Sequence, residues 1–278
     1  MNEARSSGQL IDRDAAAALI GPLTDLVIRA GAAIMAVNRG AMRIDGKDDG
    51  SPVTEADLAA DRIIGEGLAQ LIPAVPAISE ERVHRTKPPF DGSFFLIDPL
   101  DGTKEFVAGR AEFTVNIALV SNGTPLLGII GAPALGLIWR GLVGRGAERL
   151  AIGDGGAIAI AEPIHTRCLP PPGAPWIAAV SRSHGDARTE AFIDGRPGAV
   201  RLKLGSAVKL GRVAEGAADI YPRLAPTSEW DIAAGHAVVT AAGGRITDAQ
   251  GADVQFGRGR ADFIVPEFIA WGDPSAAR

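Results

Sequence analysis

The order of the expected secondary structure predicts an α+β or layered αβ fold with a sheet rich in antiparallel strands. In the first part of the 278-residue chain, two helices precede a run of strands joined by glycine turns. Beyond a boundary rich in glycine and proline, strands and helices alternate. These observations predict an N-terminal α+β half over residues 1–165 and a C-terminal α/β half over residues 170–278.

The N-terminal half is expected to begin with two helices. Residues 14–39 place apolar side chains near one helix face, and Pro22 either kinks this helix or divides it in two. The polar stretch 43–52 is expected to form a mobile loop. A second helix is expected to begin at Thr54, because Thr54 and Asp57 have the spacing of a capping box with aspartate in place of the usual glutamate.

Apolar runs of strand length follow in both halves. Strands are expected at residues 75–78, 94–98, 113–120, 126–132, 137–143, 148–152, 176–180, 200–204 and 219–222. The second half is expected to contain helices at residues 185–193, 206–215 and 232–242, and two glycines close the last one. Glycines at 153–156 and prolines at 169–173 mark the boundary between the halves.

Composition excludes several classes of protein. The only cysteine, Cys168, rules out an intramolecular disulfide and a cysteine-based zinc cluster, and it fits a reducing cytoplasm. The net charge of -5, without a basic run, argues against binding to duplex nucleic acid. The first residues have no apolar signal core. Residues 15–37 are apolar but interrupted by Pro22, Asp25 and Arg29, so we expect a packed helix and not a membrane span.

The stretch 94–106 has the pattern of a metal-phosphate site. A buried strand is expected to end at Asp98, and Asp101 follows three residues later. Gly102 and Thr103 then open a helix, whose first amides have no partner within the helix and can bind a phosphate. The alternative is a simple turn, because Asp-Pro and Asp-Gly are common turn dipeptides and Asp101 can cap a helix.

Other acidic residues stand at the starts of elements. Asp57 closes the first turn of its helix, Glu80 belongs to a glutamate pair after a buried extended segment, and Asp231 opens the last long helix. Each alone is explained by capping, by a solvated turn or by the helix dipole. Together with Asp98 and Asp101 they form a set of carboxylates of the kind that binds Mg²⁺. Such carboxylates cannot all stay ionised at close quarters without cations.

One further segment can contact an anion. Residues 181–184, Ser-Arg-Ser-His, follow an expected strand and precede an expected helix. Backbone amides and the guanidinium of Arg182 can bind a phosphate at such a place. A helix-capping turn without a ligand is the alternative.

The motifs SPVTEAD, SEE, IDPLDGT and a helix start with Trp-Asp occur in this order between about Ser51 and Asp273. This constellation resembles the lithium-sensitive, Mg²⁺-dependent phosphatases of the inositol monophosphatase superfamily. Several stretches resemble its 3'(2'),5'-bisphosphate nucleotidase branch, of the bacterial CysQ type. They are IDPLDGTKEFVAGRAEFTVNIALV, SRSH, LGSAVKLGRVAEGAADIYPR, TSEWDIAAGHAVV and FIAWGD. The resemblance implies the layered αβαβα sugar-phosphatase fold.

The resemblance also implies ligands for two Mg²⁺ ions. Glu80, Asp98 and the carbonyl oxygen of Leu100 would hold the first ion. Asp98, Asp101 and Asp231 would hold the second, so that Asp98 bridges the two. It allows a third, weaker ion near Glu80 and the loop of residues 47–51.

Catalytic and substrate-binding roles follow from the same resemblance. Asp57 would orient Thr103, and this pair would activate the attacking water. The metal-binding groups and the amides of Gly102 and Thr103 would contact the phosphate. The candidates for contacts with the nucleotide and its second phosphate are Arg182, Ser183, His184 and Lys209.

The implied reaction is hydrolysis of the 3'-phosphate of adenosine 3',5'-bisphosphate to AMP and phosphate, with 3'-phosphoadenylyl sulfate as a related substrate. Two alternatives stay open: a phosphatase acting on inositol or sugar phosphates, and a non-catalytic sensor that binds the nucleotide. The absence of Ser-His-Asp and reactive-cysteine signatures agrees with hydrolysis that forms no covalent enzyme intermediate. The resemblance implies a cytoplasmic protein, and it leaves open a homodimer and peripheral attachment to the inner membrane.

Overall fold

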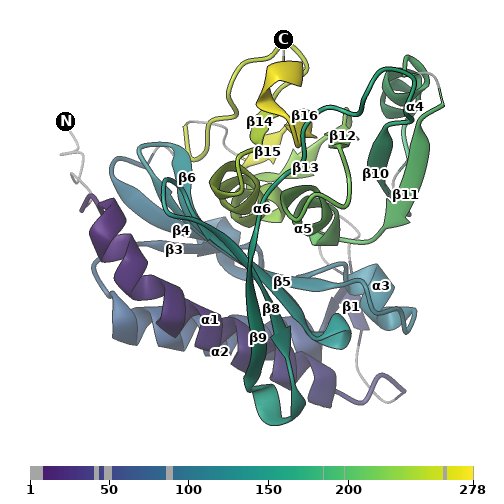
Figure 1. Ribbon diagram of the computed structural model, residues 1–278. Coiled ribbons are helices and arrows are strands. Elements are labelled where there is room, and N and C mark those ends of the chain that lie inside the picture. Colours follow the sequence, from purple (N-terminus) through teal and green to yellow (C-terminus); the bar gives the residue numbers. More distant parts are fainter. Residues whose placement is uncertain are drawn as a thin grey trace.

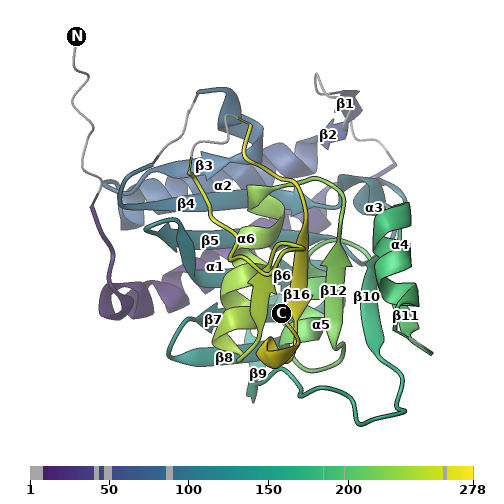
Figure 2. The same cartoon turned by 90° about the horizontal axis from the view of Figure 1, so that it is seen from above.

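Helices and sheets alternate in five layers, as the computed structural model shows (Figures 1 and 2). The structure describes residues 9–40, 44–46, 52–85, 90–183, 185–196, 198–258 and 262–277. In order, the layers are helices α1 and α2, a seven-stranded sheet, helices α5 and α6, a five-stranded sheet, and helix α4. The predicted αβαβα arrangement is confirmed.

The first layer consists of α1 (Arg13–Ala36) and α2 (Glu55–Leu71). The first helix continues through Pro22, so proline does not divide it. By length and composition α1 is apolar enough to cross a membrane, but Leu23, Val27 and Ile34 are buried in the core that α1 and α2 share with the sheet. This packing is that of a core helix, as the sequence predicts.

A short strand pair stands where the sequence predicts only a loop. Strand β1 (Ile44–Gly46) pairs in antiparallel orientation with β2 (Pro52–Thr54). The expected loop over residues 43–52 is therefore partly wrong, because residues 44–46 and 52–54 pair with each other and form a regular structure. Residues 47–51 lie outside the described part of the chain.

The seven-stranded sheet has the strand order β3-β4-β5-β6-β7-β8-β9. Its strands are β3 (Ala77–Ser79), β4 (Ser93–Asp101), β5 (Thr114–Ser121), β6 (Thr124–Ala132), β7 (Leu137–Leu142), β8 (Gly146–Ile152) and β9 (Ile158–Ile164). All neighbours are antiparallel except β3 and β4. Strand β9 was not predicted: it is an edge strand exposed along most of its length, so the burial that marks other strands is absent.

The five-stranded sheet has the order β11-β10-β12-β16-β14. Its strands are β10 (Ile177–Ser181), β11 (Val200–Leu204), β12 (Ile220–Arg223), β14 (Arg245–Thr247) and β16 (Phe268–Trp271). The helices of this half are α4 (Ala187–Asp194), α5 (Val208–Ala214) and α6 (Glu229–Ala241). Strands β10, β11 and β12 are parallel, whereas β16 is antiparallel to both of its neighbours. A separate pair joins β13 (Thr227–Ser228) to β15 (Ile264–Val265).

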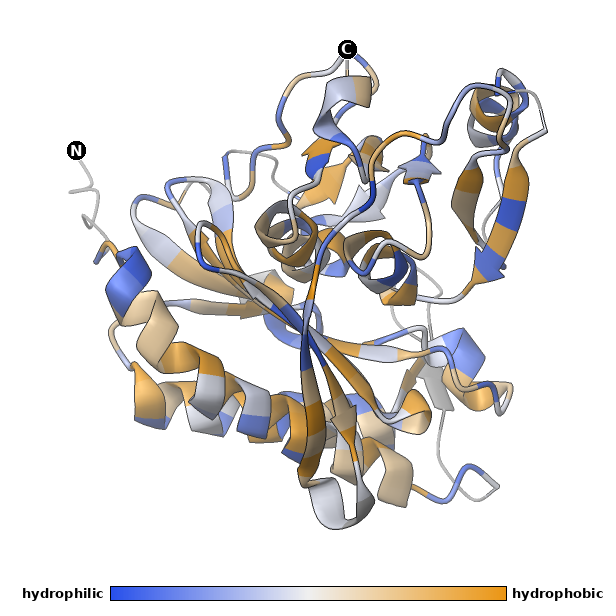
Figure 3. Ribbon diagram, in the orientation of Figure 1, coloured by the Kyte–Doolittle hydropathy of each residue, from blue (hydrophilic) through white to orange (hydrophobic). Residues whose placement is uncertain are grey.

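The largest buried cluster spans both halves of the chain. It joins Phe94 and Trp139 of the seven-stranded sheet to Leu210 of α5, Val238 of α6 and Phe268 of the five-stranded sheet. Figure 3 shows hydrophobic colouring along the strands of the larger sheet and on the helices that cover it. The strands of the larger sheet all come before residue 165 in the sequence, and those of the smaller sheet all come after residue 176. Both sheets nevertheless contribute to this core. The division into two domains at residues 165–170 stays a prediction.

Helix α6 carries a buried histidine. The side chain of His236 is only 6% exposed and meets the ring of Phe256 edge to face, with ring centroids 5.4 Å apart. Its Nδ1 atom has no hydrogen-bond partner among the described residues. Burial lowers the pKa of His236 to about 4, and the charge of Asp253 opposes this only in part.

We expect this histidine to make folding stability fall as the pH drops from about 6.5 to about 4. In that range the unfolded chain binds a proton at His236 that the folded chain does not, so acid favours unfolding. The loss attributable to this group is up to about 3 kcal/mol. Urea unfolding of the wild type and of His236→Phe at pH 7 and pH 4.5 measures it. The stability difference between the proteins should shift with pH in favour of the variant, and a constant difference would contradict the assignment.

Candidate active site

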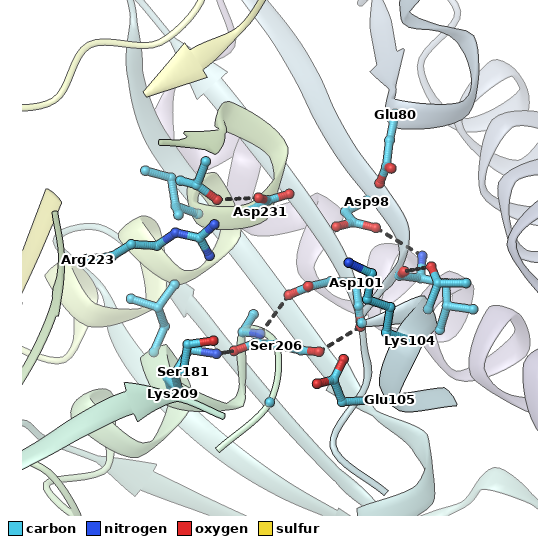
Figure 4. A pocket seen from close by; sticks show the side chains of 18 of the residues that line it. Glu80, Asp98, Asp101, Lys104, Glu105, Ser181, Ser206, Lys209, Arg223 and Asp231 are labelled. Carbon is cyan, nitrogen blue, oxygen red and sulfur yellow. Dashed lines mark hydrogen bonds between the residues drawn. The ribbon is translucent and has the colours of Figure 1, made fainter. Parts of the chain in front are cut away.

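One pocket lies where the end of β4 and helix α3 (Thr103–Val107) face the C-terminal half (Figure 4). It collects the carboxylates of Glu80, Asp98, Asp101 and Asp231. The other lining residues are Leu100, Gly102, Thr103, Lys104, Glu105, Ser181, Gly205, Ser206, Ala207, Lys209, Leu210, Tyr221, Arg223, Thr227 and Ile232. The structure therefore brings every predicted metal-binding residue to one place, although these residues span more than half of the sequence.

An irregularity at the end of β4 separates the two central aspartates. Strand β4 pairs with β5 through Asp98, loses its register, and pairs again at Asp101. The Oδ1 atom of Asp98 accepts a hydrogen bond from the amide of Leu100 at 3.1 Å, and Asp98 is 1% exposed. Extra residues between paired positions bend a strand and redirect its side chains. The bulge thus lets Asp98 and Asp101 both reach the pocket.

Gly102 sets the start of α3. It precedes the helix with a φ of 92°, a left-handed conformation that favours glycine. A Cβ atom at this position would lie 2.1 Å from the Oγ atom of Ser206. Any other residue here would strain the backbone and push the Ser206 turn away.

Thr103 contacts the carboxylate of Asp57 behind the pocket wall. The Oγ1 atom of Thr103 lies 3.0 Å from Oδ1 of Asp57 and 3.2 Å from the carbonyl oxygen of Leu100. The other carboxylate oxygen, Oδ2, accepts hydrogen bonds from the amide and hydroxyl of Thr54 at 2.8 and 2.6 Å. Burial raises the pKa of Asp57, and the hydrogen bonds from Thr54 and Thr103 oppose this. The predicted capping box is confirmed, and the same aspartate also contacts Thr103.

Asp101 is held from the other half of the chain. Its Oδ2 atom accepts a hydrogen bond from the amide of Ala207 at 2.7 Å, and its carbonyl oxygen accepts one from Ser206 Oγ at 2.8 Å. Burial, together with the negative charge of Asp231, raises the pKa of Asp101 to about 6, while Lys209 acts in the opposite direction. The protein thus places negative charges so close together that a cation between them would be strongly favoured.

Asp231 enters the pocket from the first turn of α6. Its Oδ2 atom accepts hydrogen bonds from the hydroxyl of Thr227 and from the amide of Ser228, the latter at 3.1 Å. The capping box formed by Ser228 and Asp231 fixes the start of the helix. Glu80 begins the 3₁₀ helix η1 (Glu80–Arg85), and Figure 4 shows its carboxylate extending toward Asp98 from the side opposite Asp231.

Basic residues form the wall contributed by the second half. Lys209 is 3% exposed, donates a hydrogen bond to the carbonyl oxygen of Ser206 at 2.6 Å, and lies 5.2 Å from the ring centroid of Tyr221. Burial of Arg223 disfavours its charge, but Tyr221 and the carboxylate of Asp231 keep its pKa above the usual value. No local pattern marks Arg223 as part of the site, although the family-like segment LGSAVKLGRVAEGAADIYPR ends at this residue.

Arg182 and Ser183 do not line this pocket. The guanidinium of Arg182 pairs with the carboxylate of Glu112 at 2.6 Å, and Ser183 Oγ donates to Oε1 of Glu105 at 2.5 Å. Their contacts join the two halves of the chain, and their predicted contacts with the nucleotide stay predictions. His184 lies outside the described residues.

The chemistry of the donor set fits Mg²⁺. Within the described part of the chain, no three histidine, cysteine or acidic side chains are arranged closely enough to hold a metal ion as they stand. The pocket nevertheless supplies carboxylate and carbonyl oxygens without sulfur or imidazole, which is the ligand type that Mg²⁺ prefers. Burial raises the pKa of Asp101 most, and the negative charge of Asp231, which adds to this, also favours a bound cation.

Comparison with known proteins agrees with this geometry. Residues 17–271 match the model of the inositol monophosphatase family. The chain belongs to this family. It is 38% identical over 259 residues to the "3'(2'),5'-bisphosphate nucleotidase CysQ" of Escherichia coli O157:H7, covering 90% of this chain and 98% of the relative. Enzymes of the inositol monophosphatase family are generally Mg²⁺-dependent.

Solved structures of the family share the fold. The crystal structure of CysQ from Bacteroides thetaiotaomicron superposes with a TM-score of 0.73 at 32% identity, covering 90% of this chain and 96% of that one. An inositol monophosphatase from Zymomonas mobilis gives a TM-score of 0.71 at 29% identity, covering 95% and 97%. The predicted membership in the superfamily and the likeness to its nucleotidase branch are confirmed.

We expect Asp57→Asn to slow turnover by on the order of 10²-fold while leaving metal affinity unchanged. The substitution replaces one acceptor oxygen by an amide donor and so disturbs the Thr54 and Thr103 contacts, whereas Asp57 does not line the pocket. Phosphate release and calorimetric Mg²⁺ titration measure the two effects. Asp12→Asn, at the N-cap of α1, is the matched control and should keep full activity. Wild-type kinetics in Asp57→Asn would leave Asp57 as a helix cap only.

Proposed function

We propose that the protein is a Mg²⁺-dependent phosphomonoesterase that hydrolyses the 3'-phosphate of adenosine 3',5'-bisphosphate to AMP and phosphate. The observation that carries the proposal is the meeting of Glu80, Asp98, Asp101 and Asp231 beside the helix start at Gly102. The 38% identity to a 3'(2'),5'-bisphosphate nucleotidase over most of both chains supports the choice of substrate. The related 3'-phosphoadenylyl sulfate is included in the proposed range.

The proposed ligands of the first Mg²⁺ are Glu80, Asp98 and the carbonyl oxygen of Leu100, and those of the second are Asp98, Asp101 and Asp231. Bound there, Mg²⁺ would supply Lewis-acid stabilisation of the phosphoryl oxygens and lower the pKa of a water molecule. A third ion near the 47–51 loop belongs to the same proposal.

Thr103 and Asp57 would orient the attacking water. When the Thr103 hydroxyl donates its hydrogen to Oδ1 of Asp57, its oxygen keeps lone pairs that accept a hydrogen bond from water. Asp57 is 1% exposed and fixed by Thr54, so this orientation is set before the substrate binds. The amides at the start of α3 would bind the phosphoryl oxygens. The water would then form the new P–O bond as the bond from phosphorus to the 3'-oxygen breaks, and a proton lost by the water would end on the 3'-oxygen, which gives AMP and phosphate.

The basic wall would distinguish a bisphosphate from a monophosphate. Lys209 and Arg223 line the side of the pocket opposite Glu80, and a second phosphate there would face two cations held by the fold. Guanidinium and ammonium groups both bind phosphate through charge-assisted hydrogen bonds. Arg182, Ser183 and His184 remain part of the proposed substrate contacts as the family resemblance implies them.

The same family likeness supports a cytoplasmic location for the enzyme. A homodimer and peripheral attachment to the inner membrane are further hypotheses that rest on the resemblance alone.

A substrate panel tests the proposed function. Phosphate release from adenosine 3',5'-bisphosphate should exceed that from inositol 1-phosphate and fructose 1,6-bisphosphate, and EDTA should abolish it. Preference for either of the other two esters would favour a sugar or inositol phosphatase. Binding of the nucleotide without turnover that depends on metal would favour a non-catalytic sensor.

We expect Asp98→Asn to lower the rate by at least on the order of 10²–10³, the size of effect found when one preorganised electrostatic contact is removed. The variant should remain folded, because the core around β4 is apolar and unchanged. Steady-state kinetics at saturating Mg²⁺ and circular dichroism make the two measurements. Glu148→Gln, which removes an ion pair with Arg140 on another part of the sheet, should leave the rate unchanged. A normal kcat in Asp98→Asn would remove this residue from the site.

A further inference from the structure

Glu112 lies between α3 and β5 and does not line the pocket. It contacts the turn of residues 205–207, between β11 and α5, and this turn does line the pocket. Its Oε2 atom accepts a hydrogen bond from the amide of Gly205 at 3.0 Å. Its carbonyl oxygen lies 3.0 Å from Oγ of Ser206. A Cβ atom on Gly205 would approach the Glu112 carbonyl oxygen to 2.5 Å, so the two backbones are in close contact.

The 205–207 turn also contacts Asp101 at the end of strand β4. Ser206 Oγ is 2.8 Å from the carbonyl oxygen of Asp101, and the next amide, that of Ala207, donates to Oδ2 of Asp101 at 2.7 Å. Ser206 has a φ of 48°, an uncommon conformation for a residue other than glycine, which persists only when its surroundings hold it. The contacts of Glu112 and Asp101 are two such restraints.

Arg182 is a second partner of the Glu112 carboxylate. Its guanidinium lies 2.6 Å from Oε2 and 2.9 Å from Oε1 of Glu112, and it also donates to the carbonyl oxygen of Lys203 at 3.1 Å. The Glu112 carboxylate is thereby fixed between Arg182, which follows β10, and Gly205, which begins the connection from β11 to α5. This carboxylate belongs to the N-terminal half, and both of its partners belong to the C-terminal half.

We propose that Glu112 is a positioning residue, which fixes the 205–207 turn so that the turn orients the carboxylate of Asp101 for metal binding. Glu112 itself touches neither metal nor substrate. The proposal rests on the metal site in the proposed function. It adds that metal affinity depends on a contact between the halves that lies outside the pocket.

The test measures metal binding without substrate, so that it does not depend on which ester is hydrolysed. Mn²⁺ binding is followed by electron paramagnetic resonance for the wild type, Glu112→Ala, Glu112→Gln and Ser206→Ala. Glu112→Ala should weaken Mn²⁺ binding by about tenfold or more, which is the order of effect of losing a hydrogen bond to a charged group. Glu112→Gln keeps an acceptor for the Gly205 amide and should recover most of the affinity.

Two further measurements separate positioning from general stability. The Mg²⁺ concentration for half-maximal activity should rise in Glu112→Ala, and excess Mg²⁺ should restore much of kcat with little change in KM. The double variant Glu112→Ala/Ser206→Ala should lose less than the product of the single losses, because both act through one turn. Glu162→Ala, which removes an exposed ion pair with Arg149 at the far edge of the sheet, should match the wild type throughout.

Wild-type Mn²⁺ affinity in Glu112→Ala would overturn the proposal, as would independent, multiplicative losses in the double variant. If Glu112→Ala does not fold, Ser206→Ala decides the matter: it should weaken Mn²⁺ binding, because it removes the hydroxyl that joins the Asp101 and Glu112 carbonyl oxygens, and wild-type affinity in it would overturn the proposal. Failure of the wild type to bind Mn²⁺ would instead overturn the proposed function, so the two failures are distinguishable.

Discussion

The hydrogen bond from the Ala207 amide to the carboxylate of Asp101 is the contact on which the site depends. It crosses from one half of the chain to the other and ends on a carboxylate whose pKa is raised to about 6 by burial and by Asp231. A metal ligand must be ionised, so the protein needs groups that favour the charged form. The amide, Lys209 and Arg223 do so, and all three belong to the second half.

The layered fold places the acidic residues around this contact. The bulge of β4 presents Asp98 and Asp101 at one end of the larger sheet, and the buried helix α6 presents Asp231 from between the sheets. Because the apolar core is continuous across both halves, the position of α6 relative to β4 is set by close packing. A separation of the halves would remove Asp231 and the basic wall from the carboxylates on β4.

Local patterns predicted the long helices, the capping box at Thr54 and most strands of the larger sheet, because burial on one face leaves a periodic signal. The same patterns missed the strand pair β1-β2, the exposed edge strand β9 and the short strands β13, β14, β15 and β16. All of these strands except β9 have at most four residues, and β9 is exposed along most of its length. Their pairing is decided by the assembled sheet and leaves little trace in local composition.

The sequence by itself determined the fold class, the family resemblance and the set of acidic residues, because each acid stands in a short motif with its own turn or cap. Only the tertiary structure decided which other residues share the pocket. It brought Arg223 into the wall and directed Arg182 to Glu112. These outcomes depend on contacts between segments far apart in the chain, where side-chain direction is fixed by packing and no local pattern records it.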